Sequence, residues 1–195
     1  EVLSDMKNPR AMNRLVQGDV GSGKTAVAAA AMAQAAGNGL QSAFMAPTDI
    51  LARQHYETLT RLFSASGTKI VLLTSSLGAS EKRKALSALK EGRADIAVGT
   101  NALISEGVEY KDLALVITDE QHRFGVSQRQ MLSAKGENPD VLVMTATPIP
   151  RTLAVVIYAD LDVSVIDELP PGRVPVLTKR FTEKTRGAAY DLLVK

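Results

Sequence analysis

The chain contains no cysteine and no tryptophan, and it has few histidines. The lack of cysteine excludes a disulfide framework, thiolate zinc sites and a cysteine nucleophile. Because His55 and His122 are its only histidines, a histidine-based metal site is not expected. Aromatic residues make up 4% of the sequence, too few for a platform on which nucleic-acid bases stack. Any contact with nucleic acid is therefore expected to involve its backbone.

Long apolar runs are also missing. No uninterrupted apolar segment approaches the roughly 18 residues that a membrane span needs, and residues 1–10 contain no apolar signal core. We therefore expect a cytoplasmic protein without membrane contact. The 195 residues, 45% hydrophobic and 23% charged with a net charge of +2, are typical of a soluble globular chain. This length has room for one domain, or for one domain and a fragment of another.

Apolar segments of strand length alternate with helical segments along the chain. The apolar runs are continuous, which is typical of parallel strands covered on both faces. Strands are expected at 14–17, 41–46, 69–73, 95–98, 114–118, 141–144 and 163–166, and helices at 24–36, 49–63, 80–90, 127–134 and 150–158. This order predicts an α/β fold in three layers, with a mostly parallel twisted sheet of about seven strands and helices on both faces.

Residues 168–173, Glu-Leu-Pro-Pro-Gly-Arg, break this alternation. Two prolines and a glycine in a row are expected to end one folded body and begin a tether. One strand at 174–179 and one helix at 182–194 would follow, and these cannot bury a core of their own. We therefore expect residues 1–168 to form a nucleotide-binding domain, and residues 169–195 to be a linker and the truncated start of a second domain.

The segment Gly-Asp-Val-Gly-Ser-Gly-Lys-Thr at 18–25 fits the phosphate-binding pattern G-x-x-x-x-G-K-[ST]. An expected strand enters it and an alanine-rich helix leaves it, as the motif requires, which disfavours an ordinary glycine turn. Lys24 would neutralise the β- and γ-phosphates, and the Thr25 hydroxyl would ligate Mg²⁺. Backbone N–H groups of the loop and the dipole of the following helix would add to the positive potential at the phosphates. The expected nucleotide-binding residues are Gly18, Asp19, Val20, Gly21, Ser22, Gly23, Lys24 and Thr25.

A pair of acids follows the apolar run at 113–118. At the carboxyl end of a parallel sheet, Asp119 and Glu120 would lie in the crevice beside the phosphate loop. Asp119 can hold hydrated Mg²⁺, and Glu120 can orient or deprotonate an attacking water. A plain acidic turn is the alternative, which the nearby phosphate loop disfavours. Lys24, Asp119 and Glu120 are therefore the expected catalytic residues for nucleotide hydrolysis.

The segment Asp-Glu-Gln-His at 119–122 resembles the DEAH-like motif of superfamily 2 helicases and translocases. The longer run Asp-Glu-Gln-His-Arg-Phe-Gly at 119–125 is typical of far fewer families. Together with the phosphate loop, Ala-Pro-Thr at 46–48, Thr-Ala-Thr-Pro-Ile-Pro-Arg-Thr at 145–152 and the proline-rich segment, it is similar to the RecG family of bacterial branch-migrating DNA helicases. Transcription-repair coupling translocases share two of these elements, but Gln121 and the proline-rich segment favour RecG.

This resemblance covers essentially the whole chain, and it implies the first RecA-like P-loop NTPase domain of an ATP-dependent DNA helicase in repair and recombination. The implied cofactors are ATP and Mg²⁺. The implied partners are branched or forked DNA, contacted through its phosphates, and the second RecA-like domain and the wedge domain of the same parent chain. The residues implied to couple hydrolysis to movement are Gln121, His122, Thr145 and Thr147. Those implied to contact DNA are Pro47, Thr48, Gly99 and Thr100.

The resemblance also implies that a fragment of this kind binds nucleotide weakly, hydrolyses it slowly and does not unwind DNA alone, because the second motor domain supplies arginines for catalysis. Ser75 and Asn101 depart from the family pattern in the DNA-facing loops, and Thr118 departs from it in the strand before the acids.

A P-loop phosphotransferase and a non-catalytic binding module are the alternatives from other classes. His55 and the charged run at 81–84 are expected to be surface residues, and Asp49 and Ser80 helix N-caps.

Overall fold

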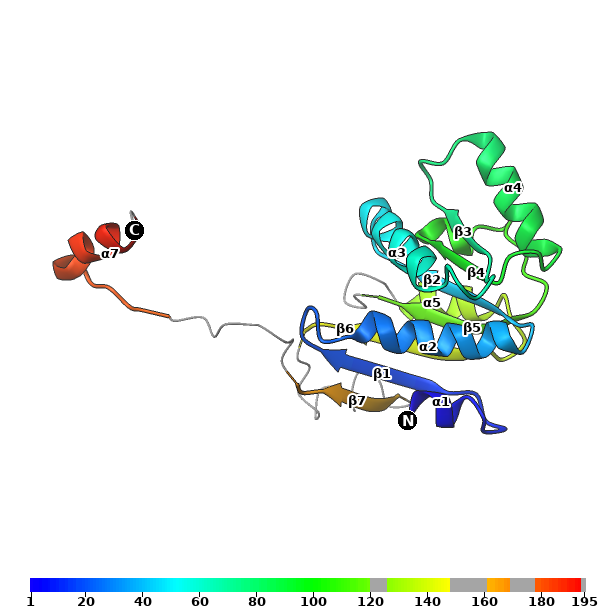
Figure 1. Ribbon diagram of the computed structural model, residues 1–195, viewed down its shortest axis with the longest axis horizontal. Helices are drawn as coiled ribbons and strands as arrows, with labels where there is room; N and C mark the ends of the chain where they lie inside the picture. Colours follow the sequence, from blue (N-terminus) through cyan, green and yellow to red (C-terminus); the bar gives the residue numbers. More distant parts are fainter. Residues whose placement is uncertain (120–125, 148–160, 169–177, 194–195) are drawn as a thin grey trace.

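The computed structural model describes residues 1–119, 126–147, 161–168 and 178–193. All seven expected strands are present in one sheet, whose order is β3-β4-β2-β5-β6-β1-β7 (Figure 1). Every neighbouring pair is parallel. The strands are β1 (Asn13–Gly18), β2 (Gln41–Met45), β3 (Ile70–Leu73), β4 (Ile96–Gly99), β5 (Leu113–Thr118), β6 (Asp140–Thr145) and β7 (Asp162–Ile166).

Helices cover both faces of the sheet (Figure 1). One face carries α1 (Val2–Asp5), α2 (Lys24–Gly37) and α3 (Asp49–Leu62). The other carries α4 (Ala79–Lys90), the short 3-10 helix η1 (Asn101–Ile104) and α5 (Val126–Ser133). Along β2, β3 and β4, hydrophobic side chains alternate between these two cores, as the pleat requires. The predicted three-layer α/β fold is confirmed.

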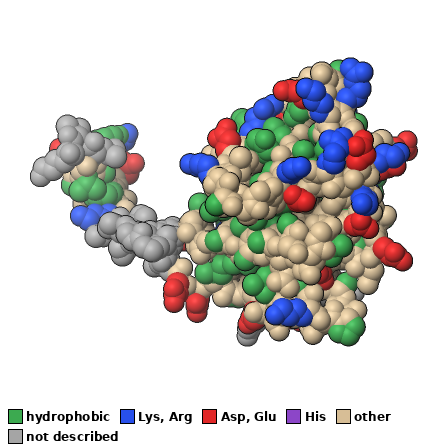
Figure 2. Space-filling model, turned by 45° about the vertical axis from the view of Figure 1, so that its right-hand side comes forward, with side chains coloured by type: hydrophobic (Ala, Val, Ile, Leu, Met, Phe, Trp, Pro, Cys, Tyr) green, Lys and Arg blue, Asp and Glu red, His purple; other side chains and the backbone are tan. Residues whose placement is uncertain are grey.

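Side-chain size and charge explain how two of these helices pack. The alanine-rich α2 buries Ala28, Ala31 and Ala35, and such small side chains let the helix lie close to the sheet. α4 buries Ala85, Ala88 and Leu89, whereas most of the charged run at 81–84 is exposed, as expected. Figure 2 shows that on one face Lys and Arg side chains gather toward the top, with Asp and Glu between them. This mixture is typical of a solvated surface.

Two helix starts differ from the expectation. Thr48, not Asp49, is the N-cap of α3: its backbone is extended, and its Oγ1 accepts a hydrogen bond of 3.3 Å from the Leu51 N–H. Asp49 is instead the first residue of the helix. The N-cap of α4 is Gly78, which has no side-chain cap, so Ser80 lies inside the first turn. The cap is the last residue with extended backbone, and that conformation is set by the preceding loop.

The C-terminal part of the chain is only partly within the described residues. The expected helix at 182–194 is present as a 3-10 turn η3 (Glu183–Thr185) followed by α7 (Arg186–Leu193). A capping box between Thr182 and Thr185 begins it. The expected helix at 150–158 and most of the expected strand at 174–179 lie outside the described residues. None of the helices in the described ranges is long and apolar enough to cross a membrane.

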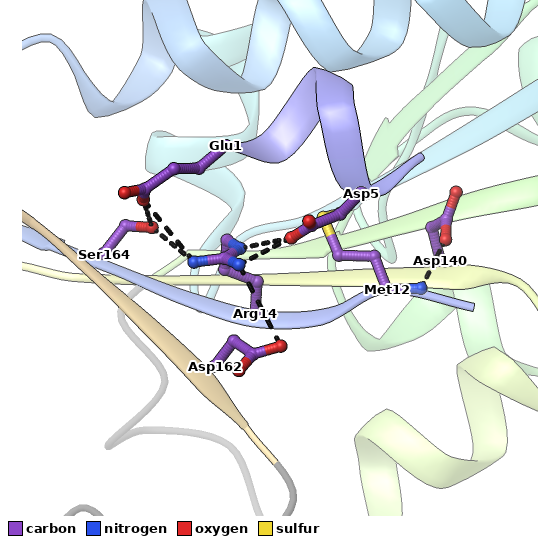
Figure 3. Close-up of polar contacts among 7 residues, drawn as sticks. All are labelled: Glu1, Asp5, Met12, Arg14, Asp140, Asp162 and Ser164. Atoms are coloured by element: carbon purple, nitrogen blue, oxygen red, sulfur yellow. Dashed lines mark hydrogen bonds and ion pairs between the residues drawn. The ribbon is translucent and has the colours of Figure 1, made fainter. Parts of the chain in front are cut away.

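One partly buried arginine joins three elements near the β7 edge of the sheet (Figure 3). Arg14 of β1 donates from Nε to Asp5 Oδ2 at 2.7 Å and from Nη1 to Ser164 Oγ at 2.8 Å. Its guanidinium also lies 3.5 Å from Glu1 Oε2 and 3.9 Å from Asp162 Oδ2. Asp5 belongs to α1, and Ser164 belongs to β7. The guanidinium therefore fastens both the N-terminal helix and the edge strand to β1.

Candidate nucleotide site

The parallel sheet brings the predicted site residues to a single edge, because the carboxyl ends of parallel strands meet there. The phosphate loop follows β1, and Asp119 follows β5. The Asp119 N–H donates to Met45 O at 3.0 Å, and the Ala46 N–H donates to Gly99 O at 2.8 Å. These two bonds fix the position of Asp119 relative to the loops that follow β2 and β4.

The phosphate loop has the backbone that its glycines predict. A Cβ on Gly18 would lie 2.5 Å from Ser22 Oγ and 3.1 Å from Ile166 Cβ, so the loop could not pass so close to β7 with a larger residue. Gly21 and Gly23 have φ angles of 82° and 102°, a region that residues with a Cβ rarely adopt. Gly23 is the N-cap of α2. The predicted strand, glycine loop and helix are therefore all present.

Lys24 lies over the loop that precedes it. Its Nζ donates to Gly18 O at 2.7 Å and to Asp19 O at 2.9 Å. The Asp19 carboxylate in turn accepts from the Val20 N–H at 2.7 Å, which closes a tight turn. Lys24 and Thr25 begin α2, so their N–H groups have no acceptor within that helix. Positive charge and free helical N–H groups thus lie at the same place, which suits a phosphate.

A hollow of about 570 Å³ lies beside this loop. It lies within the range of volumes typical of small-molecule sites. It brings together the three predicted residues Lys24, Thr25 and Asp119. The Thr25 hydroxyl and the Asp119 carboxylate supply oxygen ligands, which Mg²⁺ prefers. Its lining residues are Val20, Gly21, Gly23, Lys24, Thr25, Leu51, Gln54, His55 and Asp119.

His55 was expected at the surface, and this expectation is wrong. Its side chain is 15% exposed, and its Nε2 lies 2.8 Å from Asp119 Oδ2, which is 12% exposed. Its ring packs against Phe44 of β2, with 4.6 Å between ring centroids. The contact joins residues 64 positions apart, so no local pattern indicates it. Only the apolar face of the expected helix, taken with the acid after β5, could have suggested the pairing.

The other predicted residues lie at the same edge or outside the described residues. Glu120, Gln121 and His122 are outside them. Thr145 is buried at the end of β6, and its Oγ1 lies 2.7 Å from the exposed Thr147 Oγ1. The residues predicted to contact DNA lie at the ends of two adjacent strands: Pro47 and Thr48 come after β2, Gly99 is the last residue of β4, and Thr100 follows it. Thr48 is exposed, and Gly99 and Thr100 are buried.

Polar side chains also connect α3 to the loop after β3. Thr74 Oγ1 lies 3.1 Å from Ser76 Oγ, and Arg53 Nη2 donates to the same Ser76 oxygen at 3.2 Å. A hydrogen bond from Ser76 is the main reason that the pKa of Asp49 lies below its ordinary value. The loop containing Ser75, which departs from the family pattern, is therefore tied to the first turns of α3.

A glycine loop between β1 and α2 and an acid after β5, on a parallel sheet, define a P-loop nucleotide-binding domain of the RecA-like type. The family model for DEAD/DEAH box helicases matches residues 2–156. The chain belongs to this family.

Relatives named ATP-dependent DNA helicase RecG are similar to nearly the whole chain. The protein from Streptococcus pneumoniae is 58% identical over 92% of this chain, and that from Bacillus subtilis is 56% identical over 91%. The matched region is 26% of the length of each relative, so the chain spans about a quarter of these proteins. The resemblance to RecG is confirmed.

Solved structures are similar to the chain in fold as well. A structure of RecG bound to a three-way DNA junction has a TM-score of 0.85 and 46% sequence identity, covering 99% of this chain and 26% of that chain. A DEAD box protein from Methanococcus jannaschii has a TM-score of 0.64 and 23% identity, covering 94% of this chain and 53% of that chain. The second likeness shows the fold alone.

Proposed function

We propose that this chain is the ATP-binding motor domain of a RecG-like ATP-dependent DNA helicase or branch-migration translocase. One observation carries the proposal: β1, α2 and β5 bring Lys24, Thr25 and Asp119 to the same hollow. The similarity to RecG helicases over more than nine-tenths of the chain supports it. Residues 1–168 would be the first motor domain, and residues 169–195 would be the linker and the start of the second.

The predicted nucleotide-binding and catalytic residues each have a chemical role in this proposal. The loop N–H groups and Lys24 Nζ bind and neutralise the β- and γ-phosphates, after Lys24 exchanges its bonds to Gly18 O and Asp19 O for phosphate oxygens. Thr25 Oγ1 and the Asp119 carboxylate hold Mg²⁺, which when bound neutralises charge on the phosphates. Glu120 orients the attacking water and accepts its proton.

DNA is the proposed partner, contacted through its phosphates by the loops after β2 and β4. Pro47 and Thr48 lie in the loop after β2, and Gly99 and Thr100 lie at the end of the neighbouring strand β4. Thr145 and Thr147, with Gln121 and His122, would relay changes at the nucleotide to this DNA side.

A coupling translocase of transcription and repair would use the same motor, but the relatives at 56–58% identity are named RecG. A phosphotransferase is likewise not favoured by these relatives.

The test is nucleotide binding to the chain, measured with a fluorescent ATP analogue in the presence of Mg²⁺. Lys24→Ala is expected to weaken binding at least about tenfold, because a charged hydrogen bond to phosphate is lost. Lys84→Ala removes an exposed charge on α4 and serves as the matched control, with unchanged affinity expected. Equal affinity of the wild-type chain and Lys24→Ala would refute the proposed site.

The rate of ATP turnover tests whether this domain needs a second motor domain for catalysis. The chain is expected to hydrolyse ATP slowly and without stimulation by forked DNA, because arginines from a second motor domain supply about a thousandfold in related phosphoryl transfer. Phosphate release with and without a forked oligonucleotide measures this. Brisk turnover that DNA stimulates would show that residues 1–195 already contain a complete catalytic site.

A further inference from the structure

His55, a side chain of α3 that lines the hollow, is bonded to the expected magnesium ligand Asp119. Ile117 and Asp119 lie two residues apart, so their side chains point to the same face of the sheet, and α3 covers that face. Leu51 and His55 lie one helical turn apart and both line the hollow. α3 packs mainly over β3 and β4, and His55 reaches from it to Phe44 of β2 and to the Asp119 carboxylate that follows β5.

The chemistry of the two groups, rather than the distance between them, indicates which one donates. An ionised carboxylate only accepts hydrogen bonds, so His55 Nε2 carries the proton and donates to Asp119 Oδ2 across 2.8 Å. The ring is held by Phe44, a fully buried residue of β2, and cannot rotate freely. The Asp119 backbone is fixed independently by the Met45 carbonyl. Backbone and side chain of Asp119 are thus both restrained, from β2 and from α3.

We propose that His55 is a positioning residue for Asp119: it holds one carboxylate oxygen so that the carboxylate faces Mg²⁺ in the bound nucleotide complex. Metal-binding carboxylates are commonly oriented by such hydrogen bonds, whose loss typically costs about 10–100-fold in metal affinity. The inference rests on the proposed nucleotide site and adds to it a residue from α3, the helix whose N-cap is the proposed DNA-contacting Thr48.

Two other roles for His55 fit the structure less well. As a direct metal ligand it would have to release Asp119, and Mg²⁺ prefers oxygen over imidazole nitrogen. Within the described ranges, no group of three or more His, Cys, Asp or Glu side chains could hold a metal ion. As a packing residue alone, His55 would need only its ring against Phe44, and the 2.8 Å bond to Asp119 would have no consequence for Mg²⁺.

Three variants of the chain separate these roles. His55→Phe keeps the ring against Phe44 and removes the donor. His55→Gln restores an N–H donor at a similar reach without the ring. Thr60→Ala changes an exposed residue of the same helix and is the matched control. For each, the affinity for a fluorescent ADP analogue is measured in EDTA and across a Mg²⁺ titration, and the melting temperature is measured without nucleotide or metal.

We expect His55→Phe to need about tenfold or more Mg²⁺ to tighten nucleotide binding, with its affinity in EDTA unchanged. His55→Gln is expected to recover most of the Mg²⁺ response, and Thr60→Ala all of it. The inference is overturned if His55→Phe responds to Mg²⁺ like the wild-type chain, whatever its melting temperature. It is also overturned if His55→Gln fails as fully as His55→Phe, or if His55→Phe binds Mg²⁺ more tightly, which would mean that His55 competes with the metal.

The same titration distinguishes this inference from the proposed function. Lys24→Ala is included, and it must lose nucleotide affinity if the hollow is the nucleotide site. If the wild-type chain binds the analogue, Lys24→Ala does not, and His55→Phe keeps the full Mg²⁺ response, only the role of His55 is refuted. If Lys24→Ala binds as well as the wild-type chain, the nucleotide site itself is refuted, and the role of His55 falls with it.

Discussion

Gly99 shows how a single residue sets the spacing of strands at the functional edge. It ends β4, and a Cβ there would lie 2.1 Å from Leu73 O and 3.0 Å from the Leu73 carbonyl carbon. The obstacle is backbone of the neighbouring strand β3, which cannot move aside as a flexible side chain could. The glycine at this position therefore has a packing function, separate from the DNA contact proposed for it.

Gly99→Ala is accordingly expected to destabilise the chain by about 1–3 kcal/mol, the usual cost of overpacking a tight interior. Urea unfolding followed by far-UV circular dichroism measures the change. Gly107→Ala is the matched control, because a Cβ at Gly107 meets no atom within 4 Å and its stability should hardly change. Equal stability of the two variants would contradict the close approach of β3 and β4.

At the scale of elements, Gln41 fastens the amino end of β2 to two neighbouring segments. Its buried Nε2 donates to Leu89 O at 3.0 Å and to Ala94 O at 2.7 Å. Its Oε1 accepts from the Lys111 N–H at 2.8 Å and from the Asp112 N–H at 3.1 Å. One side chain thus satisfies backbone groups of the α4–β4 connection and of the segment that enters β5.

Gln41→Leu is expected to lower the free energy of unfolding by about 2–4 kcal/mol, because it keeps the bulk but leaves the buried Leu89 and Ala94 carbonyls without their side-chain donor, and a buried polar group without a partner costs about 1–3 kcal/mol. The measurement is again the free energy of unfolding in urea. Gln130→Leu makes the same change at an exposed position of α5 and should leave the free energy of unfolding nearly unchanged. A Gln41→Leu chain as stable as the wild type would show that water replaces these bonds without cost.

The sequence predicted the positions of strands and helices more accurately than any other feature of the structure. All seven strands lie where continuous apolar runs predicted them, because a strand covered on both faces needs apolar residues throughout. Helix starts were less accurate at Thr48 and Gly78. A cap depends on where the preceding loop leaves extended backbone, and that loop is positioned by the sheet.

At the scale of the whole molecule, the strand order divides the functional edge into two parts. The nucleotide residues follow β1 and β5, and the proposed DNA contacts follow β2 and β4. β2 lies between β4 and β5, and α3 leaves β2 to cover this region. His55 therefore lies on the element that connects the two parts.

At the β7 side of the sheet, the attachment of the outer elements depends on Arg14, which joins α1, β1 and β7 (Figure 3). Arg14→Ala should destabilise the chain by about 2 kcal/mol, since charged hydrogen bonds are lost and Asp5 keeps an unpaired charge. Hydrogen exchange should show lost amide protection in β7, while the interior strand β2 stays protected. Arg93→Ala, which breaks an exposed ion pair with Glu91, should leave both unchanged. Uniform loss of protection across the sheet would contradict a local role for Arg14.

The sequence by itself determined the fold class, the phosphate loop, the acid after β5 and the resemblance to RecG, because each is a local pattern of spacing or periodicity. Only the tertiary structure decided that His55 meets Asp119 rather than solvent. It also decided that Arg14 holds β7, although residues 14 and 164 are 150 positions apart. Such contacts depend on strand order and on which face a helix covers, and these are set by packing of the whole sheet.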